Sequence, residues 1–235
     1  AFTLENIIAI TTAGHAKALR LSVLLSLIST LVCFLLAYPL AMILANTKTS
    51  KHHFIILIFI LPMWMNFLLR TLAWQTLLEK NGVINSVLTF LNLPNLKIIN
   101  TPAAIVLGMV YNFLPFMILP LYNVLSKIDT NIINAAHDLG AGSVYTFIRI
   151  ILPLSVPGII SGITMVFVPA LTTFVISALL GGSKLLLIGD VIEQEFTRTS
   201  NWHLGSGLSI VLMIFIVINM VASAIFDKDG EGSML

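Results

Sequence analysis

Five long apolar segments constrain this chain more than any other feature of its sequence. They are residues 21–47, 54–78, 98–126, 150–183 and 204–226, and Arg70 is the only Asp, Glu, Lys or Arg among them. Each reaches or exceeds the roughly 20 residues that a helix needs to cross the hydrocarbon core of a bilayer. Backbone polar groups in lipid must be satisfied within the segment, and no period-two alternation is visible. The sequence therefore predicts an all-α integral membrane protein with five spanning helices in this chain.

Composition agrees with a membrane protein and excludes several functions. Of the 235 residues, 58% are hydrophobic and only 9% are charged, whereas soluble domains carry about 25% charged residues. Lysine and arginine form no stripe that could meet phosphates, so we expect no nucleic-acid partner. The single cysteine, Cys33, lies inside an apolar run, where packing is its expected role.

Motifs that carry chemistry are missing from the sequence. It has no phosphate-cradling Gly-rich loop, no His-Glu-x-x-His and no Cys-x-x-Cys. His52 and His53 are adjacent, so on a helix their rings would point about 100° apart and make a poor metal site. Gly205-Ser206-Gly207 is too compact for a nucleophile elbow and is expected to bend the chain before the last helix. We therefore predict no catalytic residue, no metal site and no cofactor.

The polar segment 127–149 is predicted to form two short helices. Asp129 or Thr130 would cap the first helix, which runs to about Leu139, and Gly140 would end it. Ser143 would cap the second. The first helix has a small apolar face made of Ile132, Ala135, Ala136 and Leu139. That face suits close approach by another protein, and an interfacial helix lying on lipid is the alternative.

Two other polar segments and several breaks complete the organisation. Residues 70–101 are read as a long loop with a turn at Asn81-Gly82. Residues 181–207 hold the densest charge cluster, which an ordinary solvated loop also explains. Gly158-x-x-x-Gly162 permits close helix contact in lipid. Kinks or breaks are predicted at the prolines 115, 120, 153, 157 and 169.

The first polar segment carries a family resemblance. The pattern Ala135-Ala136-x-Asp138-Leu139-Gly140-Ala141, eight residues and then Ile150-x-Leu152-Pro153 resembles the EAA motif of ABC-importer permeases. The resemblance implies a type I importer fold, with this loop as the helix that couples to the ATPase. Asn134 stands where the motif usually has Glu, which leaves Asp138 and Arg149 as the charged candidates. The implied coupling residues are Asn134, Ala135, Ala136, Asp138, Leu139, Gly140, Ala141, Arg149 and Pro153.

Other stretches resemble a narrower group, the spermidine/putrescine importer permeases, and among them the first of the two permease subunits. These stretches are Pro62-Met-Trp-Met-Asn-Phe-Leu-Leu-Arg70, Leu114-Pro-Phe116 with Pro120-Leu-Tyr122, and Gly181-Gly182 with Leu187-Ile-Gly189 and Trp202. The resemblance implies a bacterial inner-membrane location and a sixth span upstream. It also implies three partners: a second permease subunit in a heterodimer, a cytoplasmic ATPase dimer that hydrolyses the ATP, and an extracytoplasmic binding protein. A permease for ferric iron, phosphonate or similar cargo is the alternative, and a channel is a weaker one.

The resemblance also sets the orientation, with loop 127–149 cytoplasmic. Residues 1–19 are then an extracytoplasmic segment, 20–226 the transmembrane domain and 227–235 a cytoplasmic tail. The distribution of basic residues does not favour this orientation. Those inside would be Lys48, Lys51, Lys127, Arg149 and Lys228, and those outside Lys17, Arg20, Arg70, Lys80, Lys97, Lys184 and Arg198.

Candidate cargo contacts follow from the chemistry of a polyamine, a chain of positive charges on an apolar stem. Carboxylates and aromatic faces suit such a cation, and each aromatic contact is worth about 0.5–2 kcal/mol. The candidates are Trp64, Arg70, Trp74, Tyr111, Asp190, Glu193 and Glu195. Arg70 would exclude other cations or hold a carboxylate such as Glu79. Core packing or an interfacial belt is the alternative for the aromatic residues, and solvation for the acids.

Overall fold

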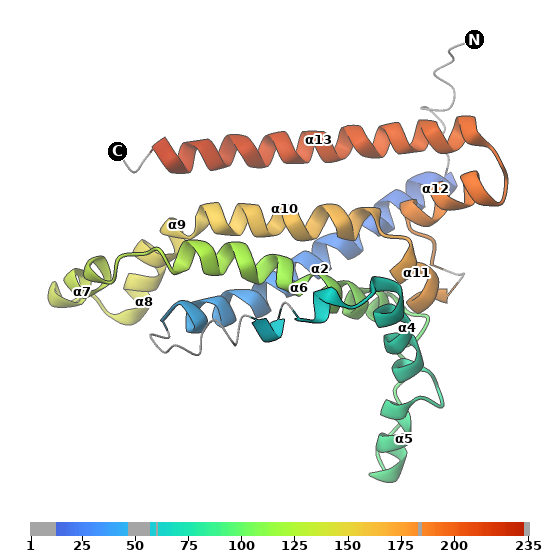
Figure 1. Cartoon of the computed structure of the whole chain (residues 1–235), viewed down its shortest axis with the longest axis horizontal. Coiled ribbons are helices and arrows are strands. Elements are labelled where there is room, and N and C mark those ends of the chain that lie inside the picture. The colour runs from blue at the N-terminus through green and yellow to red at the C-terminus, as the bar shows by residue number, and fades with distance from the viewer. Residues whose placement is uncertain (1–12, 47–56, 60, 183–184, 233–235) are drawn as a thin grey trace. The chain divides into compact units, whose positions relative to one another are not determined.

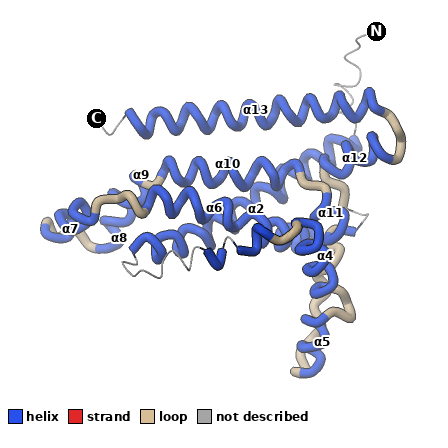
Figure 2. Tube along the Cα trace, viewed as in Figure 1, coloured by secondary structure: helices blue, strands red, loops and turns tan. Residues whose placement is uncertain are grey.

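Long helices dominate the protein (Figures 1 and 2). The structure is a computed structural model that describes residues 13–46, 57–59, 61–182 and 185–232. Those residues include no β-strand, as the sequence predicts. The long helices are α2 (Ala13–Asn46), α6 (Pro102–Leu125), α10 (Val156–Thr172) and α13 (Trp202–Gly232). The shorter ones are η2 (Leu61–Trp64), α4 (Phe67–Leu78), α5 (Val83–Phe90), α7 (Thr130–Asp138), α8 (Ser143–Thr146), the π-helix η3 (Phe147–Ile151), α9 (Leu152–Leu154), α11 (Val175–Leu180) and α12 (Ile188–Thr197).

Three of these helices are long and apolar enough to cross a membrane unaided. They cover Gly14–Asn46, Pro102–Leu125 and Trp202–Val221. Two bent pairs, Leu57–Trp64 with Phe67–Phe90 and Ser143–Leu154 with Val156–Thr172, raise the number to five if each pair is one broken span. The second pair bends by 63°, next to the predicted break at Pro153 and Pro157. By contrast, α6 continues without a break through Pro115 and Pro120.

Two local predictions are wrong. Gly205-Ser206-Gly207 does not bend the chain, because it lies within the first two turns of α13. A side chain at Gly205 would meet the Phe196 ring at 3.0 Å, so this glycine serves close packing instead. The region read as loop 70–101 contains the rest of α4 and all of α5, although its turn does lie at residues 79–82. The histidine pair 52–53 lies outside the described residues.

The chain divides into two compact units. The first comprises Ala1–Leu31, Met63–Asn112 and Phe167–Ile218. Its core gathers buried side chains from α10, α12 and α13, namely Phe167, Leu171, Ile188 and Leu212. The backbone N–H of Ile188 also donates to the Ser22 hydroxyl at 2.7 Å. Both contacts hold the start of α12 firmly in this unit.

The second unit comprises Val32–Pro62, Phe113–Val166 and Asn219–Leu235. In it α6 and α10 lie side by side (Figure 1). A Cβ at Gly158 would lie 3.0 Å from the Pro120 carbonyl oxygen, and one at Gly162 would lie 2.6 Å from the Met117 sulfur. The small-xxx-small pattern therefore allows the close helix contact that the sequence predicts.

Candidate functional site

The polar loop between α6 and α10 folds as two short helices with a sharp stop between them. Asp129 caps α7, its carboxylate accepting the Asn131 N–H at 2.9 Å. At the other end Gly140 has a φ of +83°, a left-handed conformation that favours glycine. Its N–H donates to the His137 carbonyl, and the Ala141 N–H to the Ala136 carbonyl, both at 2.9 Å. The predicted cap and the predicted stop are both confirmed.

The predicted cap of the second helix is wrong. Gly142, with extended backbone, occupies the cap position of α8, and no side chain caps that helix. Ser143 is already the first helical residue, so its backbone has left the extended conformation that a capping side chain requires. Because position 142 is a glycine without a capping side chain, the prediction fell on the next residue, Ser143.

Large apolar side chains of this loop point into solvent. Leu139 is 89% exposed, and Ile132, Val144, Tyr145 and Ile148 are each about half exposed or more. Residues 142–145, 148 and 149 line a shallow, largely apolar depression. Of the coupling residues named from the motif, Ala136 and Ala141 are half-buried, and Asn134, Ala135, Asp138, Leu139, Gly140, Arg149 and Pro153 are exposed. An exposed apolar patch of this kind is typical of a protein–protein contact.

A π-helix links the loop to the spanning helix α10. This element, η3, leads into the break at Ser155, whose hydroxyl lies 2.8 Å from the Tyr38 hydroxyl of α2. The Tyr38 and Phe147 rings also meet edge to face, with centroids 5.8 Å apart. Displacement of the loop would therefore change contacts that α2 and α10 make. No local sequence pattern predicts this contact, because Tyr38 and Ser155 are 117 positions apart.

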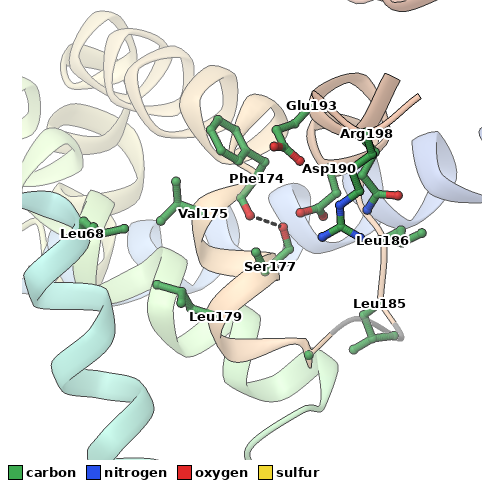
Figure 3. Close-up of a pocket in the computed structure, with 13 residues that line it drawn as sticks. Leu68, Phe174, Val175, Ser177, Leu179, Leu185, Leu186, Asp190, Glu193 and Arg198 are labelled. Atoms are coloured by element: carbon green, nitrogen blue, oxygen red, sulfur yellow. Dashed lines mark hydrogen bonds between the residues drawn. The ribbon is translucent and has the colours of Figure 1, made fainter. Parts of the chain in front are cut away.

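A cavity of about 430 Å³ lies among α4, α11 and α12 (Figure 3). Asp190, Glu193 and Arg198 lie toward one side of it, and Leu68, Val175 and Leu179 toward the other. Its lining residues are Leu68, Phe174, Val175, Ser177, Ala178, Leu179, Gly182, Leu185, Leu186, Asp190, Glu193, Gln194 and Arg198. Sequence reasoning missed the α11 contribution, since that helix reads as the end of an uninterrupted apolar segment.

Asp190 holds the start of α12. It is only 4% exposed, and its carboxylate accepts the Leu187 N–H at 2.8 Å. Burial raises the pKa of Asp190 above its usual range, and the nearby Glu193 adds to the rise. Hydrogen bonds from the Ser177 side chain and the Leu187 backbone act in the opposite direction on this pKa. Asp190 is therefore a capping residue at the wall of the cavity, with little surface left for a ligand.

The two glutamates of α12, Glu193 and Glu195, have similar surroundings but differ in whether they line the cavity. Glu193 accepts the Thr197 hydroxyl at 2.9 Å, and Glu195 accepts the Thr199 hydroxyl at 2.7 Å. Both are half-buried. Only Glu193 lines the cavity. The structure thus separates two residues that the sequence placed in one cluster.

The aromatic candidates do not form one group with these acids. Tyr111 packs edge to face on Trp74, with centroids 5.1 Å apart. The Arg70 guanidinium lies over the rings of Phe67 and Tyr111, at 6.0 and 5.9 Å from their centroids. Arg70 is 7% exposed, whereas Trp64 is 78% exposed. None of these side chains lines the 430 Å³ cavity.

These features define a multi-pass helical membrane protein with an exposed apolar loop and a charged cavity. The chain matches the family of binding-protein-dependent transport system inner membrane components over residues 6–228. The protein therefore belongs to this family of permeases and is a multi-pass protein of the bacterial inner membrane.

Named relatives align with nearly the whole chain. The spermidine/putrescine transport system permease protein PotB of Escherichia coli K12 is 38% identical over 98% of this chain and 86% of its own. PotB of Haemophilus influenzae is 37% identical over 97% and 82%. The inner membrane ABC transporter permease protein YdcU of E. coli K12 is 29% identical over 92% and 73%.

Solved structures confirm the type I importer fold. A bacterial ABC transporter involved in the import of alginate superposes with a TM-score of 0.81 at 15% identity, over 97% of this chain and 84% of the other. A second structure, the alginate transporter in complex with its alginate-bound periplasmic protein, gives a TM-score of 0.79 at 16% identity, over 94% and 81%. At this identity the similarity concerns the fold.

Proposed function

We propose that the chain is one permease subunit of an ATP-driven importer of spermidine and putrescine. The observation that supports a polyamine as the cargo is the 38% identity to PotB over 98% of the chain. The partners in this proposal are a second, similar permease subunit, a cytoplasmic ATPase dimer and an extracytoplasmic binding protein.

The coupling role belongs to segment 127–149, taken as cytoplasmic. Its exposed apolar side chains, with Leu139 the most prominent, would seat in a groove of the ATPase. ATP binding would close the ATPase dimer and displace α7 and α8 with it. The π-helix and the Tyr38–Ser155 contact, at 2.8 Å, would pass the displacement to α2 and α10. The permease then supplies the two-state element and the nucleotide biases it.

The cargo path in this proposal includes the cavity lined by Glu193. With loop 127–149 inside, α10 crosses the membrane and places α11 and α12 on the extracytoplasmic side. A carboxylate beside apolar walls matches a polyamine, which carries about two to four positive charges on a hydrocarbon stem. Glu193 is its direct contact, while Asp190 positions α12. Arg70 and Tyr111 would shape the path from α4 and α6, and Trp64 and Glu195 lie apart from the cavity.

Uptake into proteoliposomes tests the function directly. The vesicles would hold the permease with its partner permease and ATPase, with the binding protein outside and radiolabelled spermidine or putrescine supplied. We expect accumulation that requires ATP and the binding protein. Stimulated ATP hydrolysis without uptake of either polyamine would contradict the cargo and keep the permease role.

A further inference from the structure

Residues 79–97 comprise helix α5, the turn before it and the strap after it. This segment carries an apolar stripe on the outer surface. Val83, Val87, Phe90 and Leu91 have the i, i+4, i+7, i+8 spacing of one helix face. Each is more than half exposed, and Phe90 reaches 86%. In Figure 1 α5 projects away from α4 and α11. Among the residues that the structure describes, no element packs over this stripe.

The Asn85 side chain ties the polar side of α5 to the segments before and after the helix and so fixes the stripe outward. The buried Asn85 donates to the Glu79 and Leu96 carbonyls, each at 3.0 Å, and accepts the Leu96 N–H at 2.8 Å. The Thr89 hydroxyl donates to the Asn95 side chain at 2.9 Å. The helix cannot roll its apolar face inward without breaking these hydrogen bonds. The exposed stripe is therefore built into the local fold.

The charge and position of α5 favour a lipid surface as the partner that covers the stripe. Lys80 and Lys97 flank α5, and Glu79, next to Lys80, is the only aspartate or glutamate among residues 79–97. Both lysines are exposed. Leu69 and Leu72 of the neighbouring helix α4 are exposed apolar residues as well. An apolar face flanked by lysines is how an amphipathic helix lies in the interface of an anionic bilayer.

We infer that α5 is an interfacial anchor on the extracytoplasmic side of the membrane. Its stripe enters the boundary between headgroups and acyl chains, and Lys80 and Lys97 contact headgroup phosphates. The anchor would hold the outer ends of α4 and α6 at a fixed depth beside the cavity. This inference rests on the membrane placement in the proposed function and on nothing about cargo or ATP.

Spin labels on the two sides of α5 test the inference in the assembled permease. Val87→Cys lies on the stripe and Thr89→Cys on the opposite side, about 200° away at 100° per residue. Both would be made in a Cys33→Ala background and reconstituted in phosphatidylcholine vesicles with phosphatidylglycerol. We expect the Val87 label to be more accessible to oxygen than to a nickel chelate, and the Thr89 label to show the reverse. Equal access of the chelate to both labels would overturn the inference.

Two further arms separate the possible occupants. A Val87 label that loses chelate access only after the binding protein is added would assign the stripe to that protein and overturn the lipid contact. Lipid charge tests the lysines: we expect deeper immersion with phosphatidylglycerol than in pure phosphatidylcholine, and no such difference for Lys80→Gln/Lys97→Gln. Equal depth of the unsubstituted loop in both lipids would overturn the headgroup contact. Polyamine uptake by the same vesicles is scored separately, so immersion without uptake refutes only the proposed function.

Discussion

At the scale of single residues, Asp190 shows how a charge can serve structure inside a candidate cargo site. The residue is 4% exposed, and its carboxylate caps α12 by accepting the Leu187 N–H. The sequence placed it among the cargo-binding acids because composition reveals charge but not burial. A buried cap has already used its strongest acceptor, which leaves Glu193 as the better contact for a cation.

Substitution of Asp190 should separate capping from charge. Asp190→Asn retains an acceptor for the Leu187 N–H, so we expect its unfolding temperature near neutral pH to be unchanged or raised. Asp190→Ala leaves that N–H without its cap and should cost about 0.5–2 kcal/mol, seen as a lower unfolding temperature. Thermal unfolding of the purified assembly in detergent measures both, and equal losses in the two variants would contradict capping.

The pH dependence of the same transition follows from the raised pKa of Asp190. A carboxyl whose pKa is higher in the folded than in the unfolded state favours folding while it is protonated. Its contribution is complete below the ordinary pKa of 3.8 and is lost as pH rises through the higher folded value. We expect Asp190→Asn to flatten this part of the stability profile. An unchanged profile would show that Asp190 titrates alike in both states.

Gly140 and Gly142 offer a matched pair in loop 127–149. A Cβ at either would meet nothing within 4 Å, but only Gly140 has a left-handed φ. Gly140→Val should strain the stop after α7 by about 1–2 kcal/mol and shift Leu139. We expect it to reduce ATP-driven uptake while ATP hydrolysis continues, and Gly142→Ala to leave both rates nearly unchanged. Normal uptake by Gly140→Val would contradict a coupling role for this geometry.

At the scale of elements, much of the architecture could be predicted because a bilayer allows few solutions. Long charge-free runs must be helical, and Asp129 and Gly140 mark the ends of α7 by local chemistry alone. The short helices α5, α11 and α12 were missed because each holds only six to ten residues and none begins, as α7 does, after a polar capping residue. For α12 a distant partner also contributes, since the Ser22 hydroxyl accepts the Ile188 N–H, and no local pattern reveals this contact.

Packing of α6 against α10 gives a prediction that depends on what each glycine faces. At Gly158 a Cβ would meet the Pro120 backbone oxygen, which cannot move alone, whereas at Gly162 it would meet the flexible Met117 side chain. Gly158→Ala should therefore cost more, within the about 1–3 kcal/mol typical of overpacking. Unfolding temperatures of the two variants in detergent check the ranking, and a larger loss for Gly162→Ala would reverse it.

At the scale of the whole molecule, the proposed function assigns docking and cargo contact to different parts of the chain. The exposed loop 127–149 lies between α6 and α10, and the cavity lies among α4, α11 and α12. A change at one should leave the other's local structure intact. The two steps of transport, coupling and cargo binding, should therefore respond to different substitutions.

Glu193 and Glu195 allow this separation to be measured. Both lie on α12 and both accept a threonine hydroxyl four residues on, but only Glu193 lines the cavity. Losing one partly exposed contact to a cation costs about 1 kcal/mol. We therefore expect Glu193→Gln to raise the KM for spermidine uptake about fivefold, with basal ATP hydrolysis unchanged. Glu195→Gln should leave the KM within error of the unsubstituted protein, because Glu195 does not line the cavity. Equal effects of the two substitutions would remove the cavity from the cargo path and point instead to the general charge of α12.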